Sequence, residues 1–271
     1  MIEKLFIETS NLNVINSYKK KAVFIIEDLS LIKSLDKDVQ IALKLEKIYD
    51  DEMLDNIDEA IFKRIKYIFY SDLGIYHKYH DKYLHSIRFV YHAPTYLTNY
   101  HDVNYFNRIN YFVVVSNEIS SDELIKIVNR NSKKVGIDLF GLSPIFYSRR
   151  LLLTNYFNYK GLKLDPKDNN YFIREETRNN KQRIVEDENS TIIYDDEYYH
   201  LDEELNDLKN NFYGIIHLNY LDEGTQLYII DYYLNLSSHL IVSPLEGNNI
   251  KIGKGAYQNK SVLLKGDVEN E

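Results

Sequence analysis

The alternation of short apolar runs with amphipathic segments constrains the fold of this chain more than any other feature. Runs such as 22–26, 67–70 and 111–115 are each followed by a stretch with helical spacing of its apolar residues. Short buried strands that alternate with helices are typical of a parallel sheet. Seven such units precede residue 160, and an eighth strand, 214–218, precedes the helical segment 225–236. Eight units predict an α/β fold, a TIM-like (βα) barrel.

A region of different character separates units seven and eight. Residues 171–174, 183–185 and 191–194 read as short strands joined by polar turns, which predicts a small β-hairpin or meander insertion. The predicted organisation has four parts. They are barrel units one to seven (1–160), the β-meander insertion (161–211), the last barrel unit (212–240) and a C-terminal extension (241–271).

The sequence also predicts further helices and strands. Residues 50–63 are predicted to form one long helix with an apolar inner face. Ser120 and Glu123 have the spacing of a capping box, which predicts a helix over 120–131. In the extension, residues 250–252 and 261–264 are predicted to form short strands.

The stretch 135–159 combines a predicted strand with the start of a predicted helix. Residues 135–140 read as the seventh strand, Gly141 as a turn, and Ser143 with Pro144 as a helix start. Proline suits the first helical position because it has no N–H to leave unpaired. Since sites in barrels are built on the loops after the strands, this junction is a candidate site.

Arginines follow this junction closely. Arg149 and Arg150 lie within two turns of the predicted loop, beside Tyr147 and Ser148, where they can hold an anion near the helix start. The alternative is that both arginines are solvated on the polar face of an amphipathic helix.

Composition excludes several classes of chemistry. The 271 residues, 44% of them hydrophobic, are enough for a full core, and the net charge is −8. Cysteine is absent, so no disulfide, thiolate nucleophile, zinc–thiolate site or cysteine-held iron–sulfur cluster can form. The N-terminus lacks a signal pattern and the apolar runs are too short to cross a bilayer, which predicts a cytoplasmic protein without membrane contact.

The acidic balance also bears on nucleic acid. An acidic chain binds RNA by itself only if its basic residues gather on one face, and the one basic run is 19–21. RNA contact is therefore predicted to need a partner or a local patch.

Residues 140–157, FGLSPIFYSRRLLLTNYF, resemble the signature of the collagenase-like peptidase family U-32. The positions that fall on the family pattern are Gly141, Ser148, Arg150, Leu152, Leu153, Asn155 and Tyr156. The pair 98–99, the step 116–120, and the segments 172–176 and 185–188 resemble further family motifs in the same order.

This resemblance implies a TIM-like barrel. It also implies a role in hydroxylation, since several members take part in hydroxylating RNA bases or ubiquinone precursors. The sequence of this motif is most similar to that of shorter Gram-positive members. Together with a longer homologous partner, these members hydroxylate the tRNA wobble uridine using prephenate. A longer homologous subunit, tRNA contact through it, and prephenate as a ligand are thus implied.

Departures from the family pattern are equally informative. Pro144 and Leu151 stand where the family has cysteines, so its iron–sulfur cluster is not carried over. Phe140 replaces a histidine, and 216–220 reads IHLNY where the family has Lys-Ile-Glu-Gly-Arg. These losses favour a binding or scaffold subunit over an enzyme acting alone. A collagenase-like peptidase and a non-catalytic structural partner remain the alternatives.

The ligand-binding residues that we predict are Arg150, Arg149, Glu118, Ser148, Tyr147, Asn155 and His92. Arg150 leads this set because a guanidinium fork binds a carboxylate with two parallel hydrogen bonds. Its alternative role is an ion pair with Glu118 or Asp138. Glu118, at the end of the sixth strand, is otherwise a dipole partner for the helix that opens at Ser120.

No catalytic residue is assigned. His92 ends the fifth strand and His217 lies in the eighth, so either is a candidate base, but no motif supplies a nucleophile with an orienting carboxylate. The acidic run 186–188 is read as a solvated turn, so no metal site is expected.

Overall fold

The computed structural model describes residues 1–165, 171–174, 176–177, 180–235, 245 and 250–259. The chain divides into two compact units. The first comprises 1–141, 201–240 and 256–271, and the second comprises 142–200 and 241–255. The second unit therefore takes in residues 142–160, which lie within the range 1–160 predicted for the barrel.

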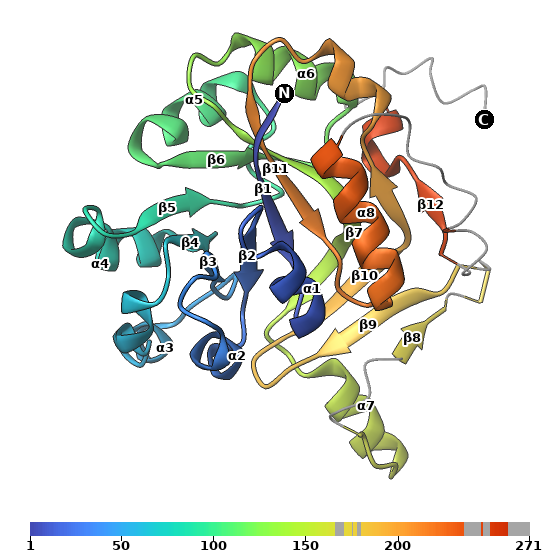
Figure 1. The fold of residues 1–271 in the computed structure, drawn as a ribbon. Helices are drawn as coiled ribbons and strands as arrows, with labels where there is room; N and C mark the ends of the chain where they lie inside the picture. Colours follow the sequence, from blue (N-terminus) through green and yellow to red (C-terminus); the bar gives the residue numbers. More distant parts are fainter. Residues whose placement is uncertain (166–170, 175, 178–179, 236–244, 246–249, 260–271) are drawn as a thin grey trace. The chain divides into compact units, whose positions relative to one another are not determined.

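The first unit is built on a closed ring of eight parallel strands (Figure 1). Sequential neighbours pair from β1 to β7, and β11 pairs with both β1 and β7, which closes the ring. The strands are β1 (Ile2–Glu8), β2 (Val23–Ile26), β3 (Ile41–Lys44), β4 (Tyr67–Tyr70), β5 (Arg88–Tyr91), β6 (Phe112–Val115), β7 (Gly136–Ser148) and β11 (Phe212–His217). The predicted TIM-like (βα) barrel is confirmed.

Helices alternate with these strands. They are α1 (Leu12–Tyr18), α2 (Leu29–Ser34), α3 (Asp51–Asp55), the 3₁₀ helix η1 (Glu59–Lys63), α4 (Leu73–Tyr83), α5 (Tyr100–Ile109), α6 (Ser121–Arg130), the 3₁₀ helix η2 (Glu203–Asp207) and α8 (Glu223–Asn235). The predicted helix start at Ser120 is confirmed, because the Ser120 hydroxyl accepts from the Glu123 amide at 3.4 Å as the N-cap of α6. In the described part of the chain, no helix combines the length and apolar character that crossing a bilayer requires.

The prediction of one long helix over 50–63 is wrong. The helical turns break at Asn56, which caps the C-terminus of α3, and resume in η1. The Asp58 carboxylate accepts from the Ala60 amide, so it starts a new helical turn.

Aromatic side chains fill the inside of the barrel. The Phe6 ring lies 5.1 Å from Tyr67, 5.5 Å from Phe69 and 5.4 Å from Phe112, centroid to centroid. All four side chains are buried. Ring pairs at these separations add to the free energy of burial, so the interior is a packed core and any site must lie at one end of the barrel.

The second unit contains a small sheet and one helix. Its elements are the end of β7, α7 (Leu152–Lys160), β8 (Tyr171–Ile173), β9 (Gln182–Glu186), β10 (Thr191–His200) and β12 (Ile252–Gly253). Strands β8, β9 and β10 pair antiparallel in sequence order, which is the predicted meander, and β12 lies parallel to β10. The 3₁₀ helix η3 (Gly255–Gln258) follows. The predicted strand 261–264 lies outside the described residues.

The prediction that Ser143 and Pro144 open a helix is wrong. Strand β7 continues through both residues to Ser148, and α7 begins only at Leu152. Its N-cap residue, Leu151, offers no capping side chain. The cap comes instead from Glu186 on β9, whose carboxylate accepts from the backbone amides of Leu153 at 2.7 Å and Thr154 at 2.9 Å. A distant carboxylate, rather than the local sequence, thus sets the helix start.

Replacing Glu186 with alanine is expected to destabilise the second unit by about 1–2 kcal/mol, because two helix amides lose their acceptor. Hydrogen exchange should show faster exchange in α7 and unchanged exchange in the barrel strands. Glu188→Ala, an exposed change in the neighbouring turn, serves as the control. Equal exchange in α7 for both variants would contradict this capping role.

Candidate functional site

Charged side chains from five strands meet at the C-terminal end of the barrel. Glu8 is the last residue of β1, Lys44 the last of β3 and His217 the last of β11. His92 directly follows β5, and Asp138 lies within β7. Since the carboxyl ends of parallel barrel strands share one rim, these residues converge there. We call Glu8, Lys44, His92, Asp138 and His217 the mouth network.

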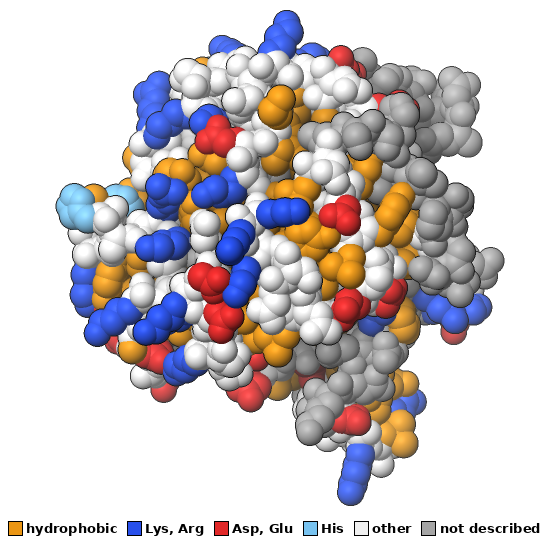
Figure 2. Space-filling view, in the orientation of Figure 1, with side chains coloured by type: hydrophobic (Ala, Val, Ile, Leu, Met, Phe, Trp, Pro, Cys, Tyr) orange, Lys and Arg blue, Asp and Glu red, His pale blue; other side chains and the backbone are white. Residues whose placement is uncertain are grey.

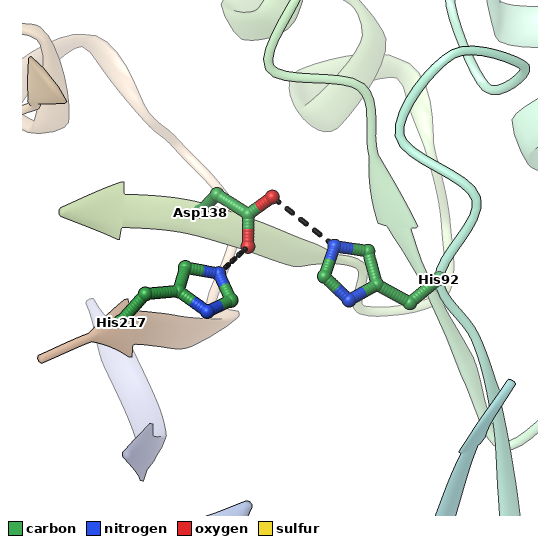
Figure 3. A group of neighbouring side chains, drawn as sticks. All are labelled: His92, Asp138 and His217. Atoms are coloured by element: carbon green, nitrogen blue, oxygen red, sulfur yellow. Dashed lines mark hydrogen bonds and ion pairs between the residues drawn. The ribbon is translucent and has the colours of Figure 1, made fainter. Parts of the chain in front are cut away.

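Asp138 lies between two histidine rings (Figure 3). Its Oδ1 atom is 3.0 Å from Nε2 of His217, and its Oδ2 atom is 3.2 Å from Nε2 of His92. The two rings are stacked with centroids 6.0 Å apart. Asp138 is only 1% exposed, so water hardly reaches its carboxylate. Its two oxygens are hydrogen-bonded by the two histidines instead.

Glu8 holds the other side of His217. One of its oxygens bonds Nδ1 of His217, and the other accepts from Nζ of Lys44 at 2.8 Å and from Nδ2 of Asn219 at 3.0 Å. Lys44 also lies 2.7 Å from a Glu27 carboxylate oxygen. Each buried charge of the network is therefore paired and hydrogen-bonded, which offsets the cost of removing it from water.

The network shifts the pKa of its members in opposite directions. Burial by itself raises the pKa of Glu8 and of Asp138, but the cationic partners outweigh it and hold both pKa values well below the usual carboxylate range. Burial lowers the pKa of His217, but the Glu8 charge and the bonds to Glu8 and Asp138 outweigh it and raise the pKa to about 9. His217 is therefore an imidazolium at neutral pH, with both N–H groups donating to carboxylates.

His92 has a different proton arrangement. An ionised carboxylate only accepts hydrogen bonds, so the contact with Asp138 assigns a proton to Nε2 of His92. Nδ1 is then an acceptor when the ring is neutral and a donor when the ring is protonated. An imidazole oriented by a buried carboxylate is the arrangement of a general base or a polar ligand contact.

Gly141 lets strand β7 pass close to His217. A Cβ atom on Gly141 would lie 2.7 Å from the Cβ of His217, and the residue has φ +157. Because its backbone stays extended within β7, the predicted turn at Gly141 is wrong. The absence of a side chain here serves the close approach of two barrel strands at the site.

Lys47 and Glu118 extend the charged region at this end. Burial, followed by repulsion from Lys44, lowers the pKa of Lys47 to about 8, while Glu8, Glu27 and Glu118 act in the other direction. Partial burial raises the pKa of Glu118, and Lys47 opposes that shift. A lysine that is only weakly held in its charged form gains from an added anion, so Lys47 is a candidate contact for a negatively charged ligand.

The residues predicted to bind a ligand fall into both units. His92 and Glu118 belong to the first unit, and His92 directly follows β5. The prediction that Glu118 ends the sixth strand is wrong, because β6 ends at Val115 and Glu118 lies in the turn that follows it. The others lie in the second unit, in β7, α7 and the link between them; they are Tyr147, Ser148, Arg149, Arg150 and Asn155. Arg149, Arg150 and Asn155 are exposed. The convergence of both groups at one rim stays a prediction.

The acidic run 186–188 is accounted for by local structure. Glu186 caps α7, and the Asp187 carboxylate accepts from the amides of Asn189 and Ser190 at 2.7 Å each. This is an Asx-type turn, in which the side chain replaces a backbone acceptor.

Two histidines and a carboxylate also form a potential metal-ligand set. Within the described residues, His92, Asp138 and His217 are the group whose ligand atoms all lie within 4.8 Å of one another. Nitrogen and oxygen donors of this kind suit Zn²⁺ or a similar divalent ion, with Glu8 orienting His217 from behind. In the hydrogen-bonded arrangement, however, both Nε2 atoms carry protons, so metal binding requires their release. The expectation of no metal site stays a prediction.

Sequence reasoning missed Glu8 and Lys44 and considered Asp138 only as an ion-pair partner of Arg150. Glu8, Lys44 and Asp138 each sit in or directly after an apolar run, FIE, IALK and GIDLF respectively. Burying a charged residue costs free energy unless it is paired. A charge within or directly after an apolar run therefore predicts a buried partner. His217 was considered only as a candidate base without a partner.

Comparison with known proteins agrees with the resemblance seen in the sequence. The model of "Peptidase family U32" matches residues 14–217. The chain is also 30% identical over 149 residues to "tRNA hydroxylation protein P2" of Bacillus subtilis (strain 168). That match spans 53% of this chain and 44% of the relative, so the chain corresponds to less than half of the length of that protein.

Proposed function

Because the chain belongs to peptidase family U32, we propose that it acts in the cytoplasm as a binding or scaffold subunit in tRNA hydroxylation. The observation that carries the proposal is its 30% identity to a protein named for tRNA hydroxylation. The enzymatic step itself is assigned to a longer homologous partner. Through this partner the tRNA is held at the site of modification.

The mouth network supports a binding role. Its buried carboxylates and the imidazolium of His217 hydrogen-bond one another. They therefore act as a rigid part of the site rather than as free acid and base groups. At the same end of the barrel, His92 offers Nδ1 for a hydrogen bond, and positive charge comes from Lys47 and from Lys44, which already pairs with Glu8 and Glu27. These groups suit a small molecule with carboxylates and hydroxyls.

Prephenate is the ligand that we propose. It is a dicarboxylate, and a guanidinium fork such as that of Arg150 binds one carboxylate bidentately. Glu118, Arg149, Ser148, Tyr147 and Asn155 complete the proposed contacts, with His92 at the barrel end. Absence of cysteine rules out a cysteine-held cluster in this chain, so any such cofactor belongs to the partner.

Prephenate at 100 times its dissociation constant is expected to stabilise the folded protein by about 2.7 kcal/mol. This stabilisation should be lost in Arg150→Ala and kept in Lys126→Gln, an exposed change on α6. Thermal shift measured against prephenate concentration tests both variants. Equal ligand stabilisation in Arg150→Ala would remove that residue from the site.

The peptidase alternative finds less support. With no cysteine in the sequence, covalent catalysis would need a serine or threonine hydroxyl as the nucleophilic side chain. Nε2 of His92 and both ring nitrogens of His217 instead bond the carboxylates of Glu8 and Asp138. If the purified chain cleaves gelatin and His92→Gln does not, the peptidase hypothesis would be favoured.

Mass spectrometry of tRNA nucleosides tests the proposed function directly. A strain lacking the gene should lose the hydroxylated wobble uridine and accumulate its unmodified precursor. Co-purification of the chain with a longer family member should accompany normal modification. Unchanged nucleosides in the deletion strain would overturn the proposal.

A further inference from the structure

The opposite end of the barrel carries a cationic surface that the mouth does not explain. The loops before the strands contribute Lys21 before β2, Lys66 before β4 and Lys133 with Lys134 before β7. Arg88 opens β5, and Lys4 lies near the start of β1. Figure 2 shows many Lys and Arg side chains over the part of the surface occupied by β1 to β6, with smaller groups of Asp and Glu side chains among them. The net charge of −8 therefore hides a strongly uneven distribution.

A hollow of about 410 Å³ lies in this basic surface. Its walls include Lys66, Arg88, His85, Gln40 and Ser86. These side chains supply cations, hydrogen-bond donors and a titratable imidazole, but no carboxylate. This lining matches a phosphate group, which needs positive charge together with several donors.

Two of the cations have neutral partners. Lys4 Nζ donates to the Tyr67 hydroxyl at 3.1 Å, and Arg88 Nη1 donates to the same oxygen at 2.9 Å. Among the described residues, no carboxylate lies within ion-pair distance of Lys4, Lys66 or Arg88. Their charge is therefore not neutralised locally, in contrast to Lys134, which pairs with Glu3.

Tyrosines hold Arg88 in place beside the hollow. The guanidinium carbon lies 4.5 Å from the Tyr111 ring centroid and 5.5 Å from that of Tyr67. Tyr111 stacks on Tyr213 with centroids 5.9 Å apart. The two rings and the Tyr67 hydroxyl restrain the guanidinium, which reduces the entropy that it loses when it binds an anion.

We propose that this surface, Lys4, Lys66 and Arg88 around the hollow, binds the phosphodiester backbone of RNA. Phosphates along a strand match several cations spread over one face, whereas an isolated small anion needs only one of them. RNA as the source of the phosphates rests on the proposed function. The inference deepens it by giving the scaffold its own contact with tRNA, away from the barrel mouth, instead of contact only through the partner.

Fluorescence anisotropy of the purified chain with labelled unmodified tRNA tests this surface at several salt concentrations. Wild-type affinity should fall steeply with salt, because bound counterions are released from the phosphates. The double variant Lys66→Gln, Arg88→Gln should bind more weakly at every salt concentration, and the slope of log K against log salt should shrink by about one per lost contact. Lys126→Gln, on α6, should keep the wild-type slope.

The outcomes separate this inference from the proposed function. If the folded double variant keeps the wild-type slope of log K against log salt, the proposed RNA-binding surface is wrong. Equal or tighter binding of duplex DNA of matched length would also contradict it. If Lys66→Gln, Arg88→Gln unfolds, Lys4→Gln with Lys66→Gln repeats the test without touching the stacked arginine. If tRNA binding depends on salt as predicted but the deletion strain has normal tRNA nucleosides, the RNA-binding surface is supported and the proposed role in hydroxylation is wrong.

Discussion

Replacing Asp138 with asparagine is expected to destabilise the barrel by about 3–5 kcal/mol, the usual cost of removing one partner from a buried ion pair. Asparagine is nearly the same size, so the loss comes from charge and hydrogen bonding. Its NH₂ group would face an N–H donor of His92 or His217, and the buried imidazolium of His217 would keep only Glu8 as a counter-charge. Urea denaturation gives the free energy of unfolding directly.

A matched surface change provides the control. The Asp81 side chain is 98% exposed although it also contacts a histidine, His80. Asp81→Asn should therefore change the free energy of unfolding by no more than about 0.5 kcal/mol. A loss below about 1 kcal/mol in Asp138→Asn would mean that the carboxylate is not the buried centre of the network.

Raising the pH is expected to weaken the barrel as His217 loses its proton. The pKa of His217 is about 9 in the folded chain against 6.5 for a free histidine. A raised folded-state pKa contributes stability that is fully present below pH 6.5 and is lost as the pH rises through about 9. At about 1.4 kcal/mol per pKa unit the loss amounts to about 3 kcal/mol.

The carboxylates give the opposite dependence at low pH. Because the pKa values of Glu8 and Asp138 are lowered on folding, their contribution is present above the ordinary carboxylate range and is lost on acidification. Stability should be highest between about pH 5 and 6.5. Unfolding free energies measured from pH 4 to 9.5 test both limbs.

Variants at two histidines separate the network from general pH effects. His217→Gln should remove the decline between about pH 6.5 and 9, because the titrating group is gone. His101→Gln, an exposed change on α5, should keep it. The same decline in both variants would assign the pH dependence to other groups.

The barrel was predictable because strand burial dominates its sequence. In β4 and β6, YIFY and FVVV are buried at every position, so continuous apolar runs mark these strands without knowledge of their neighbours. The start of α7 was not predictable, since it depends on the carboxylate of Glu186, which lies on β9, far along the chain from the helix. Pro144 and Ser143 carried a strong local signal that the sheet overrides.

The site was predictable only in part, for a related reason. His92 was singled out because it follows a buried strand. Its partner Asp138 and the Glu8–His217 pair depend on closure of the ring, which brings β1 and β7 to either side of β11. No spacing within the sequence encodes these contacts. The cationic surface also escaped notice, because Lys4, Lys66 and Arg88 are far apart in the chain and form no basic run.

Complementation of the deletion strain tests most directly whether the barrel mouth is the working site. Wild-type protein, His92→Gln and Lys44→Gln should be expressed at matched soluble levels, and the ratio of hydroxylated to unmodified wobble uridine measured by mass spectrometry. Glutamine at position 92 keeps a hydrogen bond within reach of Asp138, and glutamine at position 44 keeps a donor within reach of Glu8, so both variants should fold. Wild-type protein is expected to restore hydroxylation, and both variants are expected to restore much less. Full restoration by both variants would contradict a working site at the mouth.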